Sequence, residues 1–321
     1  MGELGRRNLG LDLVRATEAA ALTAGRWMGL GKLQEPDQAA AQAMYEVLNG
    51  LDVNGYIVIG EEERSGVQMR LAGGQHVGTG QGPEVDVVVD SIEGRRLLAQ
   101  GLPDAIAVAG AAPRGSMWAT APAIYMEKIV VDREVASALV PDCMDAPAGW
   151  TLALVARVKQ KEIRDLVVFV LDRPRHRDLI EEIRGAGARV LLRPEGDVAG
   201  ALMAASPHVQ VDVLIGVGGV AEGVIAACAV KAIRGGMLGR LAPQSEEERV
   251  AVKAAGLDTR RILTCDELVS SDEVFFSATG ITDGVLLAGV RYRGSQAKTE
   301  SLVLRCETGT RRIIHTEHLL K

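Results

Sequence analysis

Short apolar segments alternate with amphipathic ones between residues 165 and 233, and this alternation constrains the fold more than any other feature. The segments of strand length and character are residues 165–172, 189–193 and 211–219. The segments with helical spacing are residues 178–187, 197–205 and 221–233. Strands that alternate with short helices are typical of a parallel α/β layer, which we therefore predict here.

The flanking segments contribute helices first and then strands. Helices are expected at residues 11–29 and from Asp37 onward. Strands are expected at residues 56–60, 85–90, 105–111 and 123–131, and again at 273–280, 285–294, 300–306 and 311–316. We predict two α/β lobes, residues 1–150 and residues 151–321. The final strands, residues 273–321, can pack on either lobe.

Composition and charge argue against several classes of protein. The formal net charge is -6 and aromatic residues make up 3%, so we expect no nucleic-acid surface. The four cysteines form no CxxC pair and the five histidines are scattered, which argues against a zinc cluster and fits a reducing cytoplasm. No apolar stretch reaches the roughly 18 residues that a membrane helix requires. We expect a soluble, cytoplasmic protein with Cys228 and Cys306 as inert core residues.

Acidic residues stand where several of the predicted strands end or helices begin. They are Asp37, Glu61, Asp90, Glu93 and Glu222. Ligands of open α/β sheets bind outside the carboxyl ends of the strands, and acids that converge there require a cation. Oxygen ligands without nearby cysteine or histidine favour Mg²⁺ or Mn²⁺.

Each acid also has a simpler interpretation. Spacing alone favours Asp37 as an ordinary helix N-cap, and Glu222 is well placed to interact with a helix dipole. Glu62 and Glu63, next to Glu61, are typical of a solvated charge run. The DSIEG segment, residues 90–94, is harder to explain in this way, because a strand that ends in two acids before glycine is not a usual turn.

Two further segments can bind anions. The sequence GVGGVAEG, residues 216–223, brings backbone N–H groups to the start of a helix. The basic segment RPRHR, residues 173–177, follows a strand and carries guanidinium groups suited to phosphate. A basic solvated turn is the alternative for this second segment.

Ordered motifs along essentially the whole chain resemble the class II fructose-1,6-bisphosphatases, a branch of the lithium-sensitive, metal-dependent sugar and inositol phosphatases. The motifs that carry the resemblance are RATEAAAL, DQAA, YIVIGEEE, VGTGQGPEVDVVVDSIEG, APAIYMEK, RPRH, GDVAGA, IGVGGVAEGV, FFSATGIT and RRIIHTEHL. The resemblance implies a layered αβαβα fold and hydrolysis of the 1-phosphate of fructose 1,6-bisphosphate, with sedoheptulose 1,7-bisphosphate as a related substrate. It also implies Mg²⁺ or Mn²⁺ as cofactor and a homo-oligomer.

The resemblance also implies a set of site residues. The metal-binding carboxylates fall on Asp37, Glu61, Asp90, Glu93 and Glu222. The substrate contacts fall on Glu93, Gly94, Tyr125, Arg173, Arg175, Glu195, Asp197 and Gly219. Arg173 stands where the family has lysine, and Glu195 stands where it has aspartate. The charge of Arg173 and Arg175 suits the second, non-reacting phosphate.

Arg95 stands where the family has a threonine whose hydroxyl helps to orient and activate the attacking water. The family pattern Asp-Pro-(Ile/Leu)-Glu-Gly-Thr here reads Asp-Ser-Ile-Glu-Gly-Arg, residues 90–95. Arginine stays protonated at any working pH and cannot replace the threonine as a base. Other departures are Glu62 in place of a glycine, GKLQEPD without the family's Asp-Lys pair, and GGVAEG instead of GGAPEG.

These departures leave more than one function open. In the first, Arg95 contacts the substrate phosphate and hydrolysis survives. In the second, Arg95 occupies the position of a metal ion, and the protein binds sugar phosphates with little hydrolysis. Inositol-phosphate hydrolysis is a third function, which the RPRH and APAIYMEK motifs disfavour. We expect Arg95 to contact the substrate phosphate or Glu61 and its neighbours rather than to extend into solvent.

Overall fold

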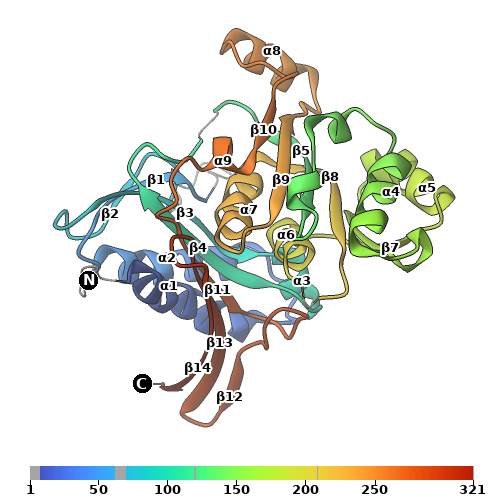
Figure 1. The fold of residues 1–321 in the computed structure, drawn as a ribbon. Coiled ribbons are helices and arrows are strands. Elements are labelled where there is room, and N and C mark those ends of the chain that lie inside the picture. Colours follow the sequence, from blue (N-terminus) through green and yellow to red (C-terminus); the bar gives the residue numbers. More distant parts are fainter. Residues whose placement is uncertain (1–7, 62–69, 119–120, 208, 321) are drawn as a thin grey trace.

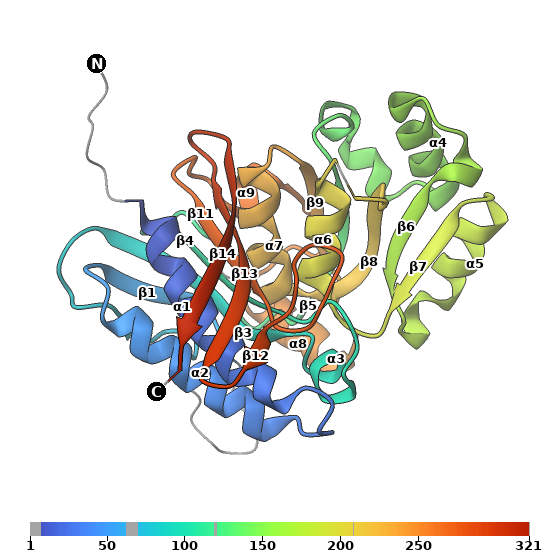
Figure 2. The same cartoon turned by 90° about the horizontal axis from the view of Figure 1, so that it is seen from below.

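The protein consists of two mixed β-sheets stacked between three layers of helices (Figure 1). The computed structural model describes residues 8–61, 70–118, 121–207 and 209–320. The view from below shows helices α1 (Leu9–Ala24) and α2 (Gln34–Asn49) at one end of the stack and α4 (Ala148–Lys159) and α5 (Arg177–Gly185) at the other (Figure 2). Helices α6 (Asp197–Ala205) and α7 (Val220–Ala232) lie between the sheets. The predicted layered α/β fold is therefore confirmed.

Within the described residues, the first sheet has eight strands in the order β12-β13-β11-β4-β3-β1-β2, with β14 paired to β13. Its strands are β1 (Asn54–Ile59), β2 (His76–Val77), β3 (Glu84–Glu93), β4 (Ile106–Pro113), β11 (Phe275–Gly280), β12 (Arg291–Arg293), β13 (Gln296–Arg305) and β14 (Thr310–Leu319). Strand β1 runs parallel to β3, whereas β3 and β4 are antiparallel. The C-terminal strands β11–β14 therefore complete the sheet that the N-terminal strands begin.

The second sheet has six strands in the order β10-β9-β5-β8-β6-β7. They are β5 (Tyr125–Val131), β6 (Val167–Leu171), β7 (Arg189–Arg193), β8 (Val213–Gly219), β9 (Gly236–Leu241) and β10 (Ile262–Thr264). The predicted parallel layer is correct for β6, β7 and β8. Strand β5 pairs antiparallel with both β8 and β9, so the sheet as a whole is mixed. Short helix α3 (Arg95–Gln100) follows β3 within the first sheet, α8 (Glu246–Ala254) joins β9 to β10 within the second, and α9 (Cys265–Leu268) lies between β10 and β11, where the chain returns to the first sheet.

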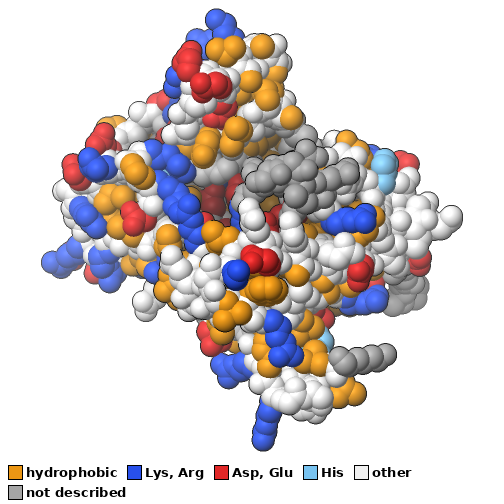
Figure 3. Space-filling view, turned by 180° about the vertical axis from the view of Figure 1, so that it is seen from behind, with side chains coloured by type: hydrophobic (Ala, Val, Ile, Leu, Met, Phe, Trp, Pro, Cys, Tyr) orange, Lys and Arg blue, Asp and Glu red, His pale blue; other side chains and the backbone are white. Residues whose placement is uncertain are grey.

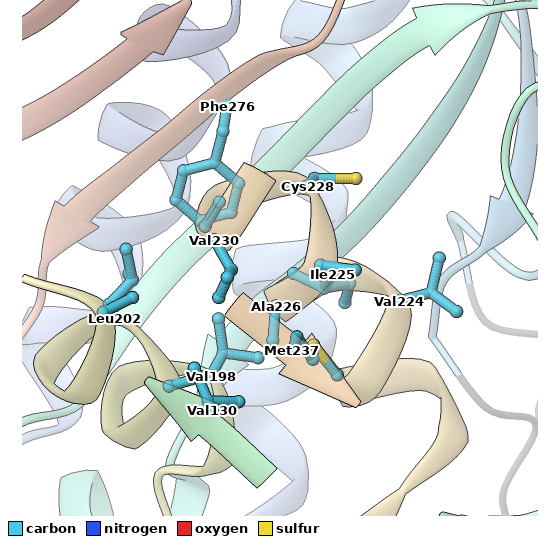
Figure 4. Close-up of a cluster of buried hydrophobic side chains, with 14 of the residues drawn as sticks. Val130, Val198, Leu202, Val224, Ile225, Ala226, Cys228, Val230, Met237 and Phe276 are labelled. Carbon is cyan, nitrogen blue, oxygen red and sulfur yellow. The ribbon is translucent and has the colours of Figure 1, made fainter. Parts of the chain in front are cut away.

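Buried side chains of the described residues form three hydrophobic cores, and successive residues of a strand contribute to different cores. In β3, Val87 and Val89 face the core under α1 and α2, whereas Val88 faces the core around α7. This is the two-residue period of a strand that is buried on both faces. The middle core joins Val198 and Leu202 of α6 to side chains of α7 and the neighbouring strands (Figure 4). Full burial of each large aliphatic side chain stabilises the fold by about 1.5–3 kcal/mol.

A buried ion-pair network fixes the entry to β6. The Asp212 carboxylate is 2% exposed. It accepts hydrogen bonds from Lys159 Nζ at 2.9 Å, from Lys161 Nζ at 2.6 Å and from the Val167 backbone N–H at 3.0 Å. Because Lys159 ends α4 and Val167 begins β6, this network fixes the position at which β6 starts. It therefore also fixes the position of the basic segment 173–177, which follows the other end of β6.

Two local predictions were wrong. The second helix begins at Gln34 rather than at Asp37. Only Arg291–Arg293 of the predicted strand 285–294 is a strand. The preceding residues form a turn, in which the Gly289 backbone N–H donates to Asp283 Oδ1 at 2.9 Å. A side chain that accepts from the local backbone competes with sheet pairing in this way.

The chain passes between the layers more than once. Strand β5 lies before residue 150 yet belongs to the second sheet, and β11 to β14 return to the first. The division into lobes at residue 150 stays a prediction. Across the described ranges, no helix has both the length and the apolar character needed to span a membrane.

Candidate active site

A cleft of about 980 Å³ lies between the ends of β3 and β8. Its walls come from the residues after β1, the start of α3, the start of β5, the 3₁₀ turn Pro174–His176, and the starts of α6 and α7. Every residue assigned to metal or substrate binding from the sequence lines this cleft, except Asp37. The rear view shows a hollow with acidic side chains at its floor and basic side chains along one side (Figure 3). Glu62 and Glu63 lie outside the described residues.

A β-bulge brings both acids of the DSIEG segment into the cleft. Residues three apart in a regular strand point to opposite faces of the sheet. In the β3–β4 ladder, Asp90 pairs with Val108 and Glu93 pairs with Ile106, so β3 carries one extra residue at this point. Asp90 and Glu93 therefore both line the cleft. The Ile92 backbone N–H, which donates to Asp90 Oδ1 at 3.0 Å, fixes the bend.

Ser91, inside the bulge, holds Glu61 in place. The Ser91 backbone N–H donates to Glu61 Oε1 at 2.9 Å, and the Ser91 hydroxyl donates to the same oxygen at 2.5 Å. These bonds connect the end of β1 to the tip of β3. Burial and the neighbouring charge of Asp37 raise the pKa of Glu61, whereas Ser91 and Arg95 act in the opposite direction. Glu61 is thus held in the cleft by Ser91, a partner that the sequence did not reveal, and its role as a metal ligand stays a prediction.

Asp37 is not a helix N-cap. Its side chain lies in the first turn of α2, three residues after the helix begins, and the residue is 5% exposed. Asp37 Oδ2 accepts a hydrogen bond from Arg95 Nη1 at 2.9 Å. The Arg95 side chain is 27% exposed, so its guanidinium lies among the acids and not in solvent. Arg95 therefore stands between Asp37 and the cleft.

Glu93 is the most deeply buried of the strand-tip acids, at 3% exposed. Its Oε1 accepts from the Val198 backbone N–H in the first turn of α6 at 3.1 Å. The pKa of Glu93 is raised to about 8, mainly by burial; the charges of Asp197, Glu222 and Glu195 also raise it, whereas the hydrogen bond from the Val198 N–H lowers it. A cation near this carboxylate would favour its ionised form.

The acids repel one another as a group. Burial raises the pKa of Asp90 well above its ordinary value, and the charges of Glu61, Glu93 and Glu222 add to this effect. The guanidinium of Arg95 offsets only part of the repulsion. Such a group of carboxylates is stabilised by a further cation.

The donor atoms fit a hard divalent cation. No three carboxylate, histidine or cysteine groups already surround a single point in the part of the chain that the structure describes. In that same part, two buried carboxylate oxygens have no hydrogen-bond partner, Asp37 Oδ1 and Glu93 Oε2. Buried oxygens of this kind are costly unless they gain a partner. Oxygen donors suit Mg²⁺ or Mn²⁺.

The basic side of the cleft is built on a rigid turn. Arg175 donates from Nη2 and Nε to the Val217 carbonyl oxygen at 2.7 and 3.1 Å, and its guanidinium lies 5.1 Å from the Tyr125 ring centroid. His176, 2% exposed, anchors the turn: its Nδ1 bonds the Leu171 carbonyl at 2.7 Å, and its Nε2 accepts from the Val217 N–H at 2.8 Å. The turn directs Arg173 and Arg175 into the cleft.

Lys128 is the main residue of the site that sequence reasoning missed. It is 1% exposed in β5, pairs with Asp197 and donates to the Gly219 carbonyl oxygen at 3.0 Å. The sequence signals are a lysine inside an apolar run and its position at the end of the APAIYMEK motif. A Cβ at position 219 would lie 1.8 Å from Glu222 Oε2, so any residue larger than glycine would displace the Glu222 side chain.

Glu195 connects α3 to the opposite wall. Its Oε2 accepts from the Arg96 backbone N–H at 2.8 Å, in the first turn of α3. Gly94 precedes that turn with φ +94°, a conformation that favours glycine. Together, Gly94 and Glu195 fix the first turn of α3 and so the direction in which the Arg95 side chain projects.

Comparisons with known proteins agree with this geometry. A family model described as bacterial fructose-1,6-bisphosphatase, glpX-encoded, matches residues 7–318. The chain is 38% identical over 328 aligned positions to fructose-1,6-bisphosphatase 1 class 2 of Escherichia coli strain K12, which covers 98% of this chain and 96% of that protein. The fructose-1,6-bisphosphatase class 2 of Shigella flexneri matches with the same identity and coverage.

Proposed function

The chain belongs to the family of bacterial, glpX-encoded fructose-1,6-bisphosphatases, and we propose that it hydrolyses the 1-phosphate of fructose 1,6-bisphosphate with a divalent cation. The main support for this proposal is that the predicted arginines and all of the predicted acids except Asp37 line one cleft. In addition, the family model matches nearly the whole length of the chain. The same membership supports sedoheptulose 1,7-bisphosphate as a related substrate and a cytoplasmic homo-oligomer in carbohydrate metabolism.

The cation, Mg²⁺ or Mn²⁺, would be held by Asp90, Glu93 and Glu222, with Glu61 and Asp37 beside them. When bound, it supplies Lewis-acid chemistry, which polarises the phosphoryl oxygens and neutralises charge on the leaving alkoxide. The bulge in β3 supplies two of these carboxylates from one strand tip. The transition state of phosphoryl transfer is loose, so this arrangement of fixed charge is the main contribution that the protein makes.

The other phosphate is held on the basic side of the cleft. Arg173 and Arg175 provide the charge, and the Tyr125 ring beside Arg175 fixes the orientation of its guanidinium. The first turns of α6 and α7 also line the cleft, and their backbone N–H groups favour anions. A bisphosphate thus meets a metal-binding side and an arginine side at its two ends.

A second function has an observation of its own. Arg95 is bonded to Asp37, one of the assigned metal ligands, and the threonine hydroxyl that the family uses for the attacking water is missing. A sugar-phosphate-binding protein with little hydrolysis is therefore the alternative.

Phosphate release from fructose 1,6-bisphosphate, with and without Mg²⁺ or Mn²⁺, tests the proposal. We expect release that depends on the cation and is abolished in Asp90→Asn. If no phosphate is released and calorimetry still detects binding of the bisphosphate, the alternative is correct. Release that persists in Asp90→Asn would exclude the assigned metal site.

A further inference from the structure

Arg95 is a fixed cation inside a group of carboxylates. Its Nη1 lies 2.9 Å from Asp37 Oδ2, and its charge also stabilises the ionised forms of Glu61 and Asp90. A threonine at this position would be too short to reach Asp37. The ion pair therefore depends on the residue that distinguishes this chain from its family at position 95.

The guanidinium is held in this place by its surroundings. Arg95 is the first residue of α3, and side chains at a helix start point back toward the N-terminus. The left-handed Gly94 before it and the bond from the Arg96 N–H to Glu195 at 2.8 Å fix the first turn. Arg95 is thus directed toward the tip of β3 and the first turn of α2.

The charge of Arg95 is distributed unevenly over the cluster. It acts on Asp37, Glu61 and Asp90, whereas the charges that act on Glu93 are those of other acids, Asp197, Glu222 and Glu195. Within the described ranges, Glu93 Oε2 and Asp37 Oδ1 are both buried without a hydrogen-bond partner, so a carboxylate oxygen is still unpaired at each end of the cluster. Arg95 therefore offsets charge at the Asp37 end of the cluster. Asp90 lies between the two ends, because Arg95, Glu93 and Glu222 all act on it, and the Glu93 end still requires a cation.

We propose that the Arg95 guanidinium replaces one divalent cation of this site, so that the chain binds fewer metal ions than it would with threonine at position 95. The remaining ion is held on the side formed by Asp90, Glu93 and Glu222. This inference rests on the proposed function for the identity of the ligands, but it concerns metal stoichiometry and not turnover.

Mn²⁺ binding, measured by equilibrium dialysis of the whole chain, tests this inference. We expect Arg95→Thr to bind about one more Mn²⁺ per chain than the wild type, because a buried carboxylate that loses its cation requires another. Arg95→Lys keeps a positive charge and should bind as many ions as the wild type. The gained ion should disappear again in Asp37→Asn/Arg95→Thr.

The matched control is Arg96→Thr, the neighbouring arginine, whose side chain is 59% exposed. It should leave the Mn²⁺ count unchanged. Thermal unfolding gives a second readout, since a ligand that binds only the folded chain raises the unfolding temperature. Added Mn²⁺ should raise the unfolding temperature of Arg95→Thr more than that of the wild type, and circular dichroism before heating establishes that each variant is folded.

Equal Mn²⁺ counts and equal Mn²⁺-induced shifts for the wild type and Arg95→Thr would overturn the inference, even if the wild type hydrolyses the bisphosphate. A gained ion in Arg95→Thr supports it, even if neither protein releases phosphate. The second result would reject the proposed hydrolysis alone, so the two failures can be told apart.

Discussion

Lys128 is a buried cation, and we expect Lys128→Met to lower the free energy of unfolding by about 3–5 kcal/mol, the usual cost of removing one partner of a buried ion pair. The residue is 1% exposed, its Nζ pairs with Asp197, and it donates to the Gly219 carbonyl at 3.0 Å. Methionine has a similar length and fills the same space. The loss therefore comes from Asp197, which is 8% exposed and would stay beside Glu93 without its cation.

Urea and thermal unfolding, followed by circular dichroism, measure this loss. At roughly 2 °C for each kcal/mol in a large domain, the midpoint should fall by about 6–10 °C. The double variant Lys128→Met/Asp197→Leu should regain most of the loss, because neither charge is then left alone. Lys298→Met removes an exposed lysine paired with Glu317 and should change the midpoint little. The reasoning is refuted if Lys128→Met is as stable as Lys298→Met.

Three further predictions concern other parts of the site and its support. Burial raises the pKa of Asp212, but hydrogen bonds from two lysines and one backbone N–H outweigh burial, so the pKa is lowered in the folded chain. The carboxylate therefore stabilises the fold above the ordinary pKa of aspartate, about 3.9. This contribution is lost as the pH falls through the lower pKa of the folded chain. Asp212→Asn should therefore flatten the fall in unfolding temperature between about pH 5 and pH 2, measured by calorimetry. Gly219→Ala should weaken Mn²⁺ binding in dialysis by displacing Glu222, whereas Gly185→Ala, where a Cβ meets nothing within 4 Å, should not. Arg175→Ala should raise KM for the bisphosphate by about 10-fold or more with a smaller effect on kcat, because a charge-assisted bond to phosphate contributes about 1.5–3 kcal/mol.

The fold could be predicted from the sequence wherever periodicity was strong. The apolar run Val87–Val89 predicted strand β3, and the strands that alternate with helical segments between residues 165 and 233 predicted an α/β layer. The antiparallel placement of β5 beside β8 was not predictable, because it depends on pairing between segments more than 80 residues apart. Local competition explains the lost strand at residues 285–290, where the Asp283 side chain takes a backbone N–H.

The site could be predicted in its residue types but not in its geometry. The spacing of Asp90 and Glu93 favours opposite faces, and only the bulge in the β3–β4 ladder reverses this. Asp37 was misread as an N-cap because the start of α2, three residues earlier, has no side-chain cap to mark it. The role of Lys128 depends on α6 and β8, which fold against it from distant parts of the chain.

The two sides of the cleft differ in how an added positive charge acts on them. On the basic side, Arg175 bonds the Val217 carbonyl oxygen and contacts the Tyr125 ring, so its guanidinium is held in place. On the acidic side, Arg95 is a cation bonded to the carboxylate of Asp37. A phosphate-binding surface can tolerate one more positive charge, because the ligand is an anion. A set of metal ligands cannot tolerate an added positive charge, because that charge competes with the metal ion for the carboxylates. The effect of Arg95 should therefore be seen first in metal binding and only then in catalysis.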